Sequence, residues 1–360
     1  MKILINFAIV GGGWRSNTYL TIAKLLPNIF KICGIVVRNA EKGSLIEKTW
    51  NIKTYQTIEE LLKVDFPEFI VVAVSWNAAP EIVKNLIEHK IPILSETPPA
   101  PDLKSLKELY SLVKNKNIKY QVAEQYHLQP LHAARIKIIQ SGILGEIREI
   151  NISVCHGYHA ISLIRKMVGL KYENVAISAQ RFIFPIVRTH NRDGKIENMM
   201  KVNSSQVIAT LNFGNKFAIY NFSDEQYFSW IRSPQLTIRG DKGEIHNKKL
   251  TYIKDNKSPV ELYLNRMNAG EDGNLEGYYL KGILGGNEWV YKNPFIPARL
   301  TDDEIAVSTC LYKMHQYLAG GAEFYSLSEA AQDHYLSILI EESAKTGNII
   351  HSKTQPWAFS

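Results

Sequence analysis

Two short segments of the chain concentrate side chains that could transfer a proton. They are Glu124-Gln-Tyr-His127 and His156-Gly-Tyr-His159. A histidine has a reference pKa of about 6.5, so it can serve as a general acid or base near neutral pH. A carboxylate such as Glu124 or Glu96 could fix the tautomer of a histidine, and Tyr126 or His127 could bind hydroxyl groups or polarise a carbonyl. The alternative for each residue is an ordinary hydrogen bond at a domain junction.

A glycine-rich turn near the N-terminus predicts a nucleotide-binding site. Apolar, β-branched residues lead into Gly-Gly-Gly-Trp-Arg-Ser at residues 11–16, and an amphipathic segment follows. Gly11 permits a tight turn, Gly13 lets the backbone approach a pyrophosphate, and Ser16 is small enough for close packing of helix on strand. The N-terminus of the following helix would direct its N–H groups at the phosphates. The alternative is a glycine-rich turn in another kind of α/β protein.

The first third of the sequence alternates short apolar strands with helical patterns, which predicts a parallel sheet covered on both faces. The expected strands are Ile3–Val10, Ile32–Val37, Phe69–Val74, Ile91–Ser95 and Tyr120–Ala123. The expected helices are Asn17–Leu26, Ile58–Leu62, Pro80–His89 and Leu103–Lys114. Open α/β sheets bind ligands beyond the carboxyl ends of their strands. One crevice should therefore be lined by the glycine turn, Arg38, Ser75–Asn77, Glu96–Pro98 and Glu124–His127.

After Pro130 the pattern changes. Helices are expected at Leu131–Ser141 and His159–Val168, with a strand at Glu146–Val154 between them. Residues 175–253 alternate strands with turns, which predicts a largely antiparallel sheet. Residues 254–300 are polar and rich in glycine and asparagine, so we expect long loops around the site or a subunit contact. Two further helices are expected at Asp303–Leu318 and Leu327–Thr346.

Composition and charge exclude several classes of protein. The chain has 45% hydrophobic and 21% charged residues, as ordinary globular proteins do. No apolar run approaches the roughly 18 residues of a membrane span, and the N-terminal stretch resembles a strand more than a signal peptide. The net charge of +7 comes from scattered basic residues without a nucleic-acid-binding motif. Three widely spaced cysteines argue against a disulfide framework and a zinc cluster. We expect a cytoplasmic protein with no metal, no membrane contact and no nucleic-acid partner.

Six motifs in sequence order resemble the Gfo/Idh/MocA family of NAD(P)-dependent oxidoreductases over nearly the whole chain. They are Ile91–Pro98 (for Glu-Lys-Pro), Val74–Asn77 (for Thr-Pro-Asn), Gln140–Gly145, Gly157–His159 (for Gly-x-His), Leu236–Gly243 (for Ile-x-Gly-x-x-Gly) and Asp302–Ile305. The resemblance implies an α/β fold with an N-terminal Rossmann doubly wound parallel sheet and a C-terminal α/β domain with a large, mostly antiparallel sheet. We place the dinucleotide-binding domain at residues 1–126 and a substrate-binding and oligomerisation domain at residues 127–360. The resemblance also implies a homodimer or homotetramer.

The activity that the resemblance implies is oxidation of a secondary hydroxyl, or reduction of a ketone, on a sugar, glycoside or polyol. The family's catalytic lysine and aspartate are replaced here by Thr97 and Cys155, whereas its histidine remains as His159. Thr97 could orient a substrate oxygen or the nicotinamide, and a thiol such as Cys155 is a poor base at neutral pH. We therefore expect His159 to transfer the proton. The further catalytic candidates are Tyr126, His127, His156 and Thr97. The alternatives are a nucleotide- or sugar-binding module that has lost catalysis, and reduction of an imine or double bond with the histidine as proton donor.

The preferred cofactor depends on Arg38, which ends the second predicted strand. An NAD-specific site would have an acidic residue there to bind the ribose hydroxyls. An arginine favours the 2′-phosphate of NADP over NAD, unless it stacks on the adenine and the site accepts either cofactor. The candidate cofactor-binding residues are Gly11, Gly12, Gly13, Trp14, Arg15, Ser16, Arg38, Ser75, Trp76, Asn77, Glu96, Thr97, Pro98 and Glu124.

Overall fold

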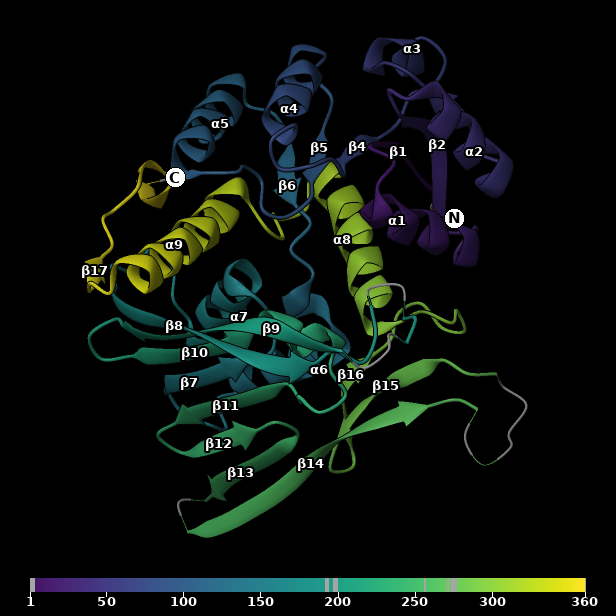
Figure 1. Ribbon diagram of the computed structural model, residues 1–360. Helices are drawn as coiled ribbons and strands as arrows, with labels where there is room; N and C mark the ends of the chain where they lie inside the picture. The colour runs from purple at the N-terminus through teal and green to yellow at the C-terminus, as the bar shows by residue number, and fades with distance from the viewer. Residues whose placement is uncertain are drawn as a thin grey trace.

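The computed structural model describes residues 4–191, 194–196, 200–255, 257–270, 272 and 277–359. Two sheets form the framework of the chain, one in the N-terminal third and one in the teal-to-green middle (Figure 1). The first is a six-stranded parallel sheet in the order β3-β2-β1-β4-β5-β6. Its strands are β1 (Ile5–Val10), β2 (Phe30–Val36), β3 (Thr54–Tyr55), β4 (Phe69–Val72), β5 (Ile93–Ser95) and β6 (Tyr120–Val122).

The strand order of this sheet reverses between β1 and β4. Strands β2 and β3 lie on one side of β1, whereas β4, β5 and β6 lie on the other. The arrangement is that of a doubly wound Rossmann sheet, in which a crevice opens at the carboxyl ends of the two strands at the reversal. The connecting helices are α1 (Trp14–Leu25), α2 (Ala40–Trp50), α3 (Ile58–Leu62), α4 (Ala79–Glu88) and α5 (Leu103–Lys116).

Alternate residues of the central strands belong to two different apolar cores. Ile5, Phe7 and Ile9 of β1 join one buried cluster, whereas Ala8 and Val10 join the other. Successive side chains of a strand point to opposite faces of the sheet, so both faces of β1 are buried. This double burial explains why the strands are apolar nearly throughout.

The predicted strands and helices of this half are confirmed within a few residues, although Ile3 of the first predicted strand lies outside the described residues. The sequence analysis missed α2 and β3. Helix α2 buries only Gly43 among its residues, so it has little apolar periodicity to detect. A Cβ at Gly43 would lie 2.8 Å from Thr54 Oγ1, and the glycine thus lets α2 approach β3 closely.

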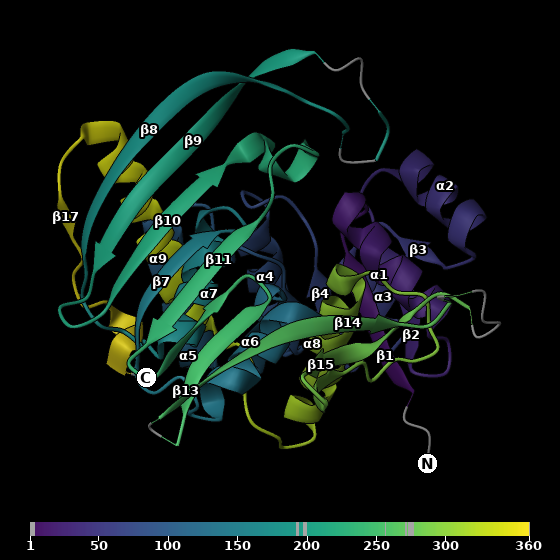
Figure 2. The same cartoon turned by 90° about the horizontal axis from the view of Figure 1, so that it is seen from below.

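The second sheet has eleven strands in the order β16-β15-β14-β13-β12-β11-β7-β10-β9-β8-β17. All its described neighbouring pairs are antiparallel except β7 with β10, which confirms the predicted mostly antiparallel sheet. Helices lie behind the sheet when it is seen from below (Figure 2). The elements that follow β6 and precede β14 are η1 (Tyr126–Leu128), α6 (Pro130–Gln140), β7 (Ile147–Ser153), α7 (Gly157–Val168), β8 (Ala176–Val187), β9 (Lys201–Asn212), β10 (Phe217–Ser223), η2 (Asp224–Phe228), β11 (Gln235–Gly240), β12 (Gly243–His246) and β13 (Lys249–Lys254).

The expectation of long loops over residues 254–300 was wrong. Three strands extend the sheet there, namely β14 (Ser258–Asn268), β15 (Leu280–Gly285) and β16 (Glu288–Lys292). Val260, Leu262 and Leu264 of β14 do alternate with polar residues, as a half-buried strand requires. Glycines in β15 obscured the pattern. A Cβ at Gly282 would lie 2.3 Å from the carbonyl oxygen of Tyr291, so the close pairing of β15 with β16 itself requires a glycine.

Helix α8 (Asp302–Leu318) returns from the second sheet to the first. Its Val307, Leu311 and Met314 join the buried cluster that contains Phe7 of β1 and Leu20 of α1. Near the opposite edge of the first sheet, the N–H of Val122 in β6 donates to the carbonyl of Tyr325 at 2.9 Å.

Helix α9 (Leu327–Thr346) packs on α7 and β8 of the second half, and β17 (Ile350–His351) and η3 (Pro356–Phe359) follow it. Among the described residues, no helix is both long enough and apolar enough to cross a membrane. Helix α8 belongs to the proposed second domain but buries its apolar side against the Rossmann sheet. The proposed domain boundary between residues 126 and 127 therefore stays a prediction.

Candidate active site

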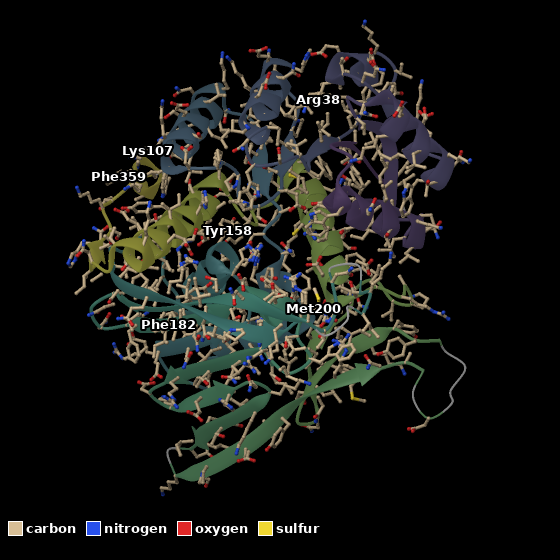
Figure 3. All side chains as sticks on the ribbon, viewed as in Figure 1. Arg38, Lys107, Tyr158, Phe182, Met200 and Phe359 are labelled. Carbon is tan, nitrogen blue, oxygen red and sulfur yellow. The ribbon has the colours of Figure 1, made fainter. Side chains whose placement is uncertain are left out.

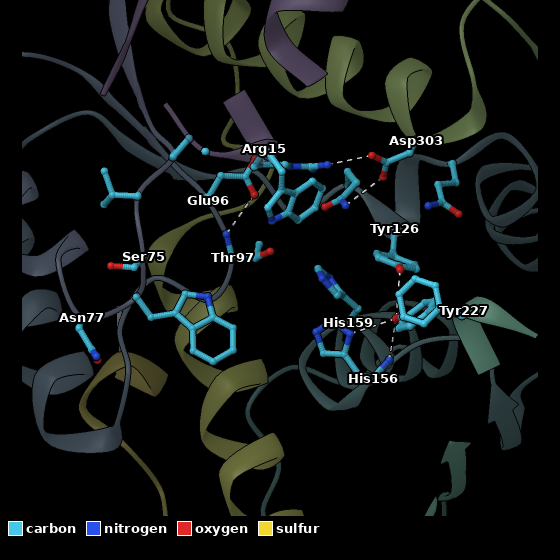
Figure 4. Close-up of a pocket in the computed structure, with 18 residues that line it drawn as sticks. Arg15, Ser75, Asn77, Glu96, Thr97, Tyr126, His156, His159, Tyr227 and Asp303 are labelled. Carbon is cyan, nitrogen blue, oxygen red and sulfur yellow. Dashed lines mark hydrogen bonds and ion pairs between the residues drawn. The ribbon is translucent and has the colours of Figure 1, made fainter. Parts of the chain in front are cut away.

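A cavity of about 880 Å³ lies where the two halves of the molecule meet. Figure 4 shows its histidines and tyrosines on one wall, Ser75 and Asn77 on the opposite wall, and Thr97 between them. The residues that line it are Gly13, Trp14, Arg15, Ala73, Val74, Ser75, Trp76, Asn77, Glu96, Thr97, Gln125, Tyr126, Gln129, His156, His159, Tyr227, Phe228 and Asp303. The cavity thus opens at the carboxyl ends of β1, β4, β5 and β6, where a doubly wound sheet binds its ligand.

The glycine turn forms one end of the cavity. Gly11 has φ +120°, and a Cβ there would lie only 2.2 Å from the carbonyl oxygen of Ala73, so β1 and β4 can approach only around a glycine. Ser16 Oγ donates to the Gly11 carbonyl at 2.8 Å. A Cβ at Gly13, by contrast, would meet no atom within 4 Å. Gly13 also begins α1 without a side-chain cap. This end of the cavity therefore has the open space and the helix N-terminus that a pyrophosphate requires.

A partly buried ionic cluster lies directly behind this turn. Arg15 Nε donates to Glu96 Oε1 and Arg15 Nη1 donates to Asp303 Oδ2, each at 2.8 Å. Tyr19 and Gln125 complete the cluster as donors to Glu96 and Asp303 respectively. Burial opposes the charge of Arg15, but the two carboxylates hold the pKa of its guanidinium well above the ordinary value. The cluster ties α1, β5 and α8 together at the cavity wall.

His159 and Glu124 form a hydrogen-bonded pair on the opposite side of the cavity. His159 Nδ1 lies 2.6 Å from Glu124 Oε2, and Glu124 is completely buried. Glu124 Oε1 accepts the backbone N–H of Tyr126 at 3.1 Å. Because Nδ1 faces Glu124, Nε2 is the ring nitrogen that remains for a ligand in the cavity.

Burial shifts the two pKa values of the pair in opposite directions. It raises the pKa of Glu124 well above the ordinary value of a carboxyl and lowers the pKa of His159 to about 3. Both shifts disfavour a carboxylate–imidazolium ion pair, so the ring of His159 stays neutral. The pair can therefore give up or take up a proton as one unit.

Aromatic hydroxyl and imidazole groups surround the pair. The rings of Tyr126 and His159 are 4.3 Å apart between centroids. Tyr126 Oη lies 3.3 Å from Tyr227 Oη, which in turn accepts the backbone N–H of His156 and lies 3.0 Å from His156 Nδ1. These groups form a polar edge on an apolar wall, which suits a ligand that carries several hydroxyl groups.

The structure brings most of the predicted site residues to the cavity, but not all of them. Among the catalytic candidates, His127 does not line the cavity, and its half-buried ring packs on Tyr325 with 5.1 Å between ring centroids. Cys155 is completely buried outside the cavity, and burial holds the pKa of its thiol well above the ordinary value. Arg38 is exposed on the Rossmann half, whereas Tyr158 lies between the two sheets (Figure 3). The remaining cofactor candidates that do not line the cavity are Gly11, Gly12, Ser16, Pro98 and Glu124.

Seven residues that line the cavity were not among the candidate catalytic and cofactor-binding residues. They are Ala73, Val74, Gln125, Gln129, Tyr227, Phe228 and Asp303. Gln125 could have been predicted, because it lies between Glu124 and Tyr126 in a segment that was expected to line the crevice. Asp303 lies in the first turn of α8, within the Asp302–Ile305 motif, to which the sequence analysis gave no role in the site. Tyr227 lies in a short 3₁₀ segment after β10, and no local sequence pattern distinguishes it.

Comparison with known proteins finds a family match in the N-terminal third of the chain. Residues 5–124 match the GFO_IDH_MocA model, described as an oxidoreductase family with an NAD-binding Rossmann fold. The uncharacterized oxidoreductase C26H5.09c of Schizosaccharomyces pombe is 27% identical over 146 residues, which cover 40% of this chain and 40% of that protein. The chain thus matches two fifths of the length of this relative.

Solved structures share the fold of both halves. An oxidoreductase from Agrobacterium radiobacter in complex with NAD+, L-tartaric acid and magnesium has a TM-score of 0.69 at 16% identity, over 96% of this chain and 98% of that one. Levoglucosan dehydrogenase in complex with NADH and levoglucosan has a TM-score of 0.69 at 16% identity, over 97% and 99% of the two chains. At such identities the likeness establishes the architecture of this chain.

Proposed function

We propose that the chain, whose residues 5–124 form the NAD-binding Rossmann domain of the Gfo/Idh/MocA oxidoreductase family, is an NAD(P)-dependent oxidoreductase. Its substrate would be a secondary hydroxyl, or the corresponding ketone, on a sugar, glycoside or polyol. The observation that carries the proposal is the His159–Glu124 pair, which faces the same cavity as the glycine turn. The likeness to a levoglucosan dehydrogenase supports a sugar-like substrate.

The residues around the glycine turn fit a dinucleotide. The backbone of residues 11–13 and the N-terminus of α1 would hold the pyrophosphate, because an anion is stabilised by the N–H groups and dipole of a helix end. Arg38 would contact the adenosine ribose, and its charge favours a 2′-phosphate. Thr97 would orient the nicotinamide or a substrate oxygen. When bound, the cofactor accepts or donates the hydride, which no side chain of the protein can do.

His159 would exchange the proton of the substrate hydroxyl. In oxidation, Nε2 accepts that proton while the proton on Nδ1 moves to the carboxylate of Glu124. The His159 ring then carries a proton on Nε2 and stays uncharged, as its buried position favours. In reduction the same two protons move back, and Nε2 protonates the carbonyl oxygen. Tyr126, Tyr227 and His156 would bind neighbouring hydroxyl groups of the substrate and hold the reacting carbon in place.

The test measures reduced nicotinamide when the purified protein is incubated with NAD or NADP and a panel of sugars, glycosides and polyols. We expect turnover by the wild type and a decrease of about 10²–10⁴-fold in His159→Asn, the usual contribution of a general acid–base group. Nucleotide affinity should stay unchanged. His351→Asn, which changes an exposed histidine far from the cavity, should behave as the wild type. Tight nucleotide binding without turnover on any substrate would instead favour a noncatalytic binding module.

A further inference from the structure

The ionic cluster of Arg15, Glu96 and Asp303 places an excess of negative charge on one side of the cavity. One guanidinium pairs with two carboxylates, so the charge of one carboxylate is left over. Among the described residues that line the cavity, Arg15 is the only lysine or arginine. The Asp303 side chain is 39% exposed, whereas those of Arg15 and Glu96 are 11% and 13% exposed. The more accessible carboxylate is therefore Asp303.

The charges of this cluster act across the cavity. Figure 4 shows Glu96, Arg15 and Asp303 along one side of the cavity and His159 on the other side. Burial lowers the pKa of His159 most and Arg15 lowers it further, whereas Glu96 and Asp303 each raise it. A ligand that displaces water from the space between them would therefore lie in the field of the cluster, where charges are weakly screened.

Two buried polar atoms of the cluster have no hydrogen-bond partner among the described residues. Gln125 Nε2 donates to Asp303 Oδ1 at 3.1 Å, and an ionised carboxylate can only accept, so the contact fixes which end of the amide is Oε1. This Oε1 is unpaired, and so is Nη2 of Arg15. Gln125 is only 5% exposed, and both side chains line the cavity. A ligand there can supply the missing donor and the missing acceptor.

We propose that this side of the cavity is a site for the oxidised nicotinamide ring. Asp303 and Glu96 attract the positive charge of the ring. Its carboxamide group donates an N–H to Gln125 Oε1 and accepts from Arg15 Nη2. The inference rests on the proposed function, which places the pyrophosphate at the glycine turn and the reacting hydroxyl at His159, so that the ring must lie between the two. It goes further because it assigns the redox form of the cofactor that these residues prefer.

The preference follows from the charge of the ring, since the oxidised ring is a cation and the reduced ring is neutral. Residues that bind the oxidised form more tightly than the reduced form lower the reduction potential of the bound cofactor. Each tenfold preference corresponds to about 30 mV for a two-electron couple. The excess charge also repels the pyrophosphate, but it does so equally in both forms. The preference therefore depends on the ring alone.

The experiment compares dinucleotides that differ only in the ring. NAD has both the charge and the carboxamide. Benzamide adenine dinucleotide has the carboxamide on an uncharged aromatic ring, and acetylpyridine adenine dinucleotide has the charge but a methyl group in place of the amino group. NADH is the reduced, uncharged form. Calorimetric titration gives the dissociation constant of each probe, with no substrate present.

The variants are Asp303→Asn, which removes the accessible charge, and Gln125→Met, which removes the unpaired acceptor. Asp302→Asn is the matched control, because Asp302 precedes Asp303 in the first turn of α8 but pairs with Arg266 and does not line the cavity. In Asp303→Asn the affinity for NAD should fall about tenfold, whereas the affinities for NADH and the benzamide dinucleotide should change by less than about twofold. In Gln125→Met the affinity for NAD should fall about two- to tenfold, and that for the acetylpyridine dinucleotide should not.

Asp302→Asn should match the wild type with all four probes. Equal losses for NAD and the benzamide dinucleotide in Asp303→Asn would overturn the inference, because Asp303 would then act on the whole dinucleotide rather than on the ring charge. Glu96→Gln repeats the same comparison if Asp303→Asn fails to fold. A wild type that binds none of the dinucleotides would overturn the proposed function together with the inference. Binding by the wild type with equal losses for charged and uncharged rings would overturn the inference alone.

Discussion

The chemistry at the scale of single residues depends on how Glu124 and His159 divide their protons. A carboxylate beside Nδ1 sets which nitrogen of the ring faces the substrate, and the 2.6 Å contact is short enough to hold that orientation. Thr97 lines the cavity but has no useful ionisation, and Cys155 is buried outside it. The charge changes of the proposed reaction therefore concentrate on one pair of side chains.

Replacing Glu124 by glutamine should separate orientation from proton transfer. In Glu124→Gln the amide still hydrogen-bonds to Nδ1 but cannot accept a proton, so turnover should fall by about 10²–10⁴-fold while nucleotide affinity is kept. Steady-state kinetics and calorimetric titration measure the two effects. Glu323→Gln, at an exposed carboxylate near the edge of the first sheet, is the control. Turnover close to that of the control would mean that Glu124 only orients the ring.

We expect the preference between NADP and NAD to depend on a single residue, Arg38. Arg38→Asp should lower the affinity for NADP relative to NAD by at least about tenfold, because a charge-assisted contact with the 2′-phosphate contributes about 1.5–3 kcal/mol. Lys31→Asp makes the same change of charge at the other end of β2 and should leave the ratio of the two affinities as it was. Equal losses for both cofactors in Arg38→Asp would show that the arginine stacks on the adenine and gives no preference.

At the scale of the elements, the glycine turn combines two requirements in three residues. Gly11 is required by the fold, since any Cβ would collide with the Ala73 carbonyl oxygen at 2.2 Å. A Cβ at Gly13 would meet no protein atom, so only a ligand in the cavity would require a glycine there. Gly11 is thus explained by the packing of the sheet, and Gly13 by the proposed ligand.

Valine at each glycine should give opposite phenotypes. Gly13→Val should fold normally, because its Cβ meets nothing, but should lose nucleotide binding because the branched side chain fills the phosphate space. Gly11→Val should lower the melting temperature sharply, since both its positive φ and its contact with Ala73 are unfavourable. Calorimetry of binding and of thermal unfolding tests both variants. Normal nucleotide affinity in Gly13→Val would remove the basis for placing the pyrophosphate at this turn.

The sequence predicted best those elements whose residue pattern follows directly from burial. β1 and β4 are buried on both faces, and their mostly apolar runs predicted them well. The sequence analysis selected the segments around Glu124 and His159 for proton transfer, and the structure brings these two residues into contact. Tyr227 and Asp303 could not be predicted, because their partners Tyr126 and Arg15 are 101 and 288 positions away in sequence and become neighbours only through the packing of η2 and α8. Strand β14 was missed, although its apolar residues alternate with polar ones, because residues 254–300 were interpreted from their polar composition alone.

On the scale of the whole molecule, buried titratable groups govern the response to acid. Burial lowers the pKa of several histidines and raises the pKa of two carboxyls. They are His127, His132, His159 and His334 on one side, and Glu124 and Asp333 on the other. A histidine with a lowered pKa binds fewer protons in the folded protein than in the unfolded chain, so it takes up protons on unfolding. A carboxyl with a raised pKa binds more protons in the folded protein, so it releases protons on unfolding.

The free energy of unfolding should therefore decrease as the pH falls from about 6.5 to about 4.5. Four histidines gain protons on unfolding and two carboxyls lose them. The unfolded chain therefore binds more protons than the folded protein in this range, and the free energy of unfolding has a positive slope against pH. Urea unfolding at a series of pH values measures it. His127→Phe should lower the slope by about one proton, and a stability that rises on acidification would contradict the assignment.

The ion pair between Arg15 and Asp303 joins residues 288 positions apart, and it also sets the order in which the chain can fold. A ribosome adds about 5–20 residues per second, so α1 waits on the order of 15–60 seconds for its partner in α8. During that time the apolar side chains that α8 later covers, including those of Phe7 and Leu20, have no native neighbour there. The nascent Rossmann half therefore keeps this apolar surface without its native cover until α8 has been translated.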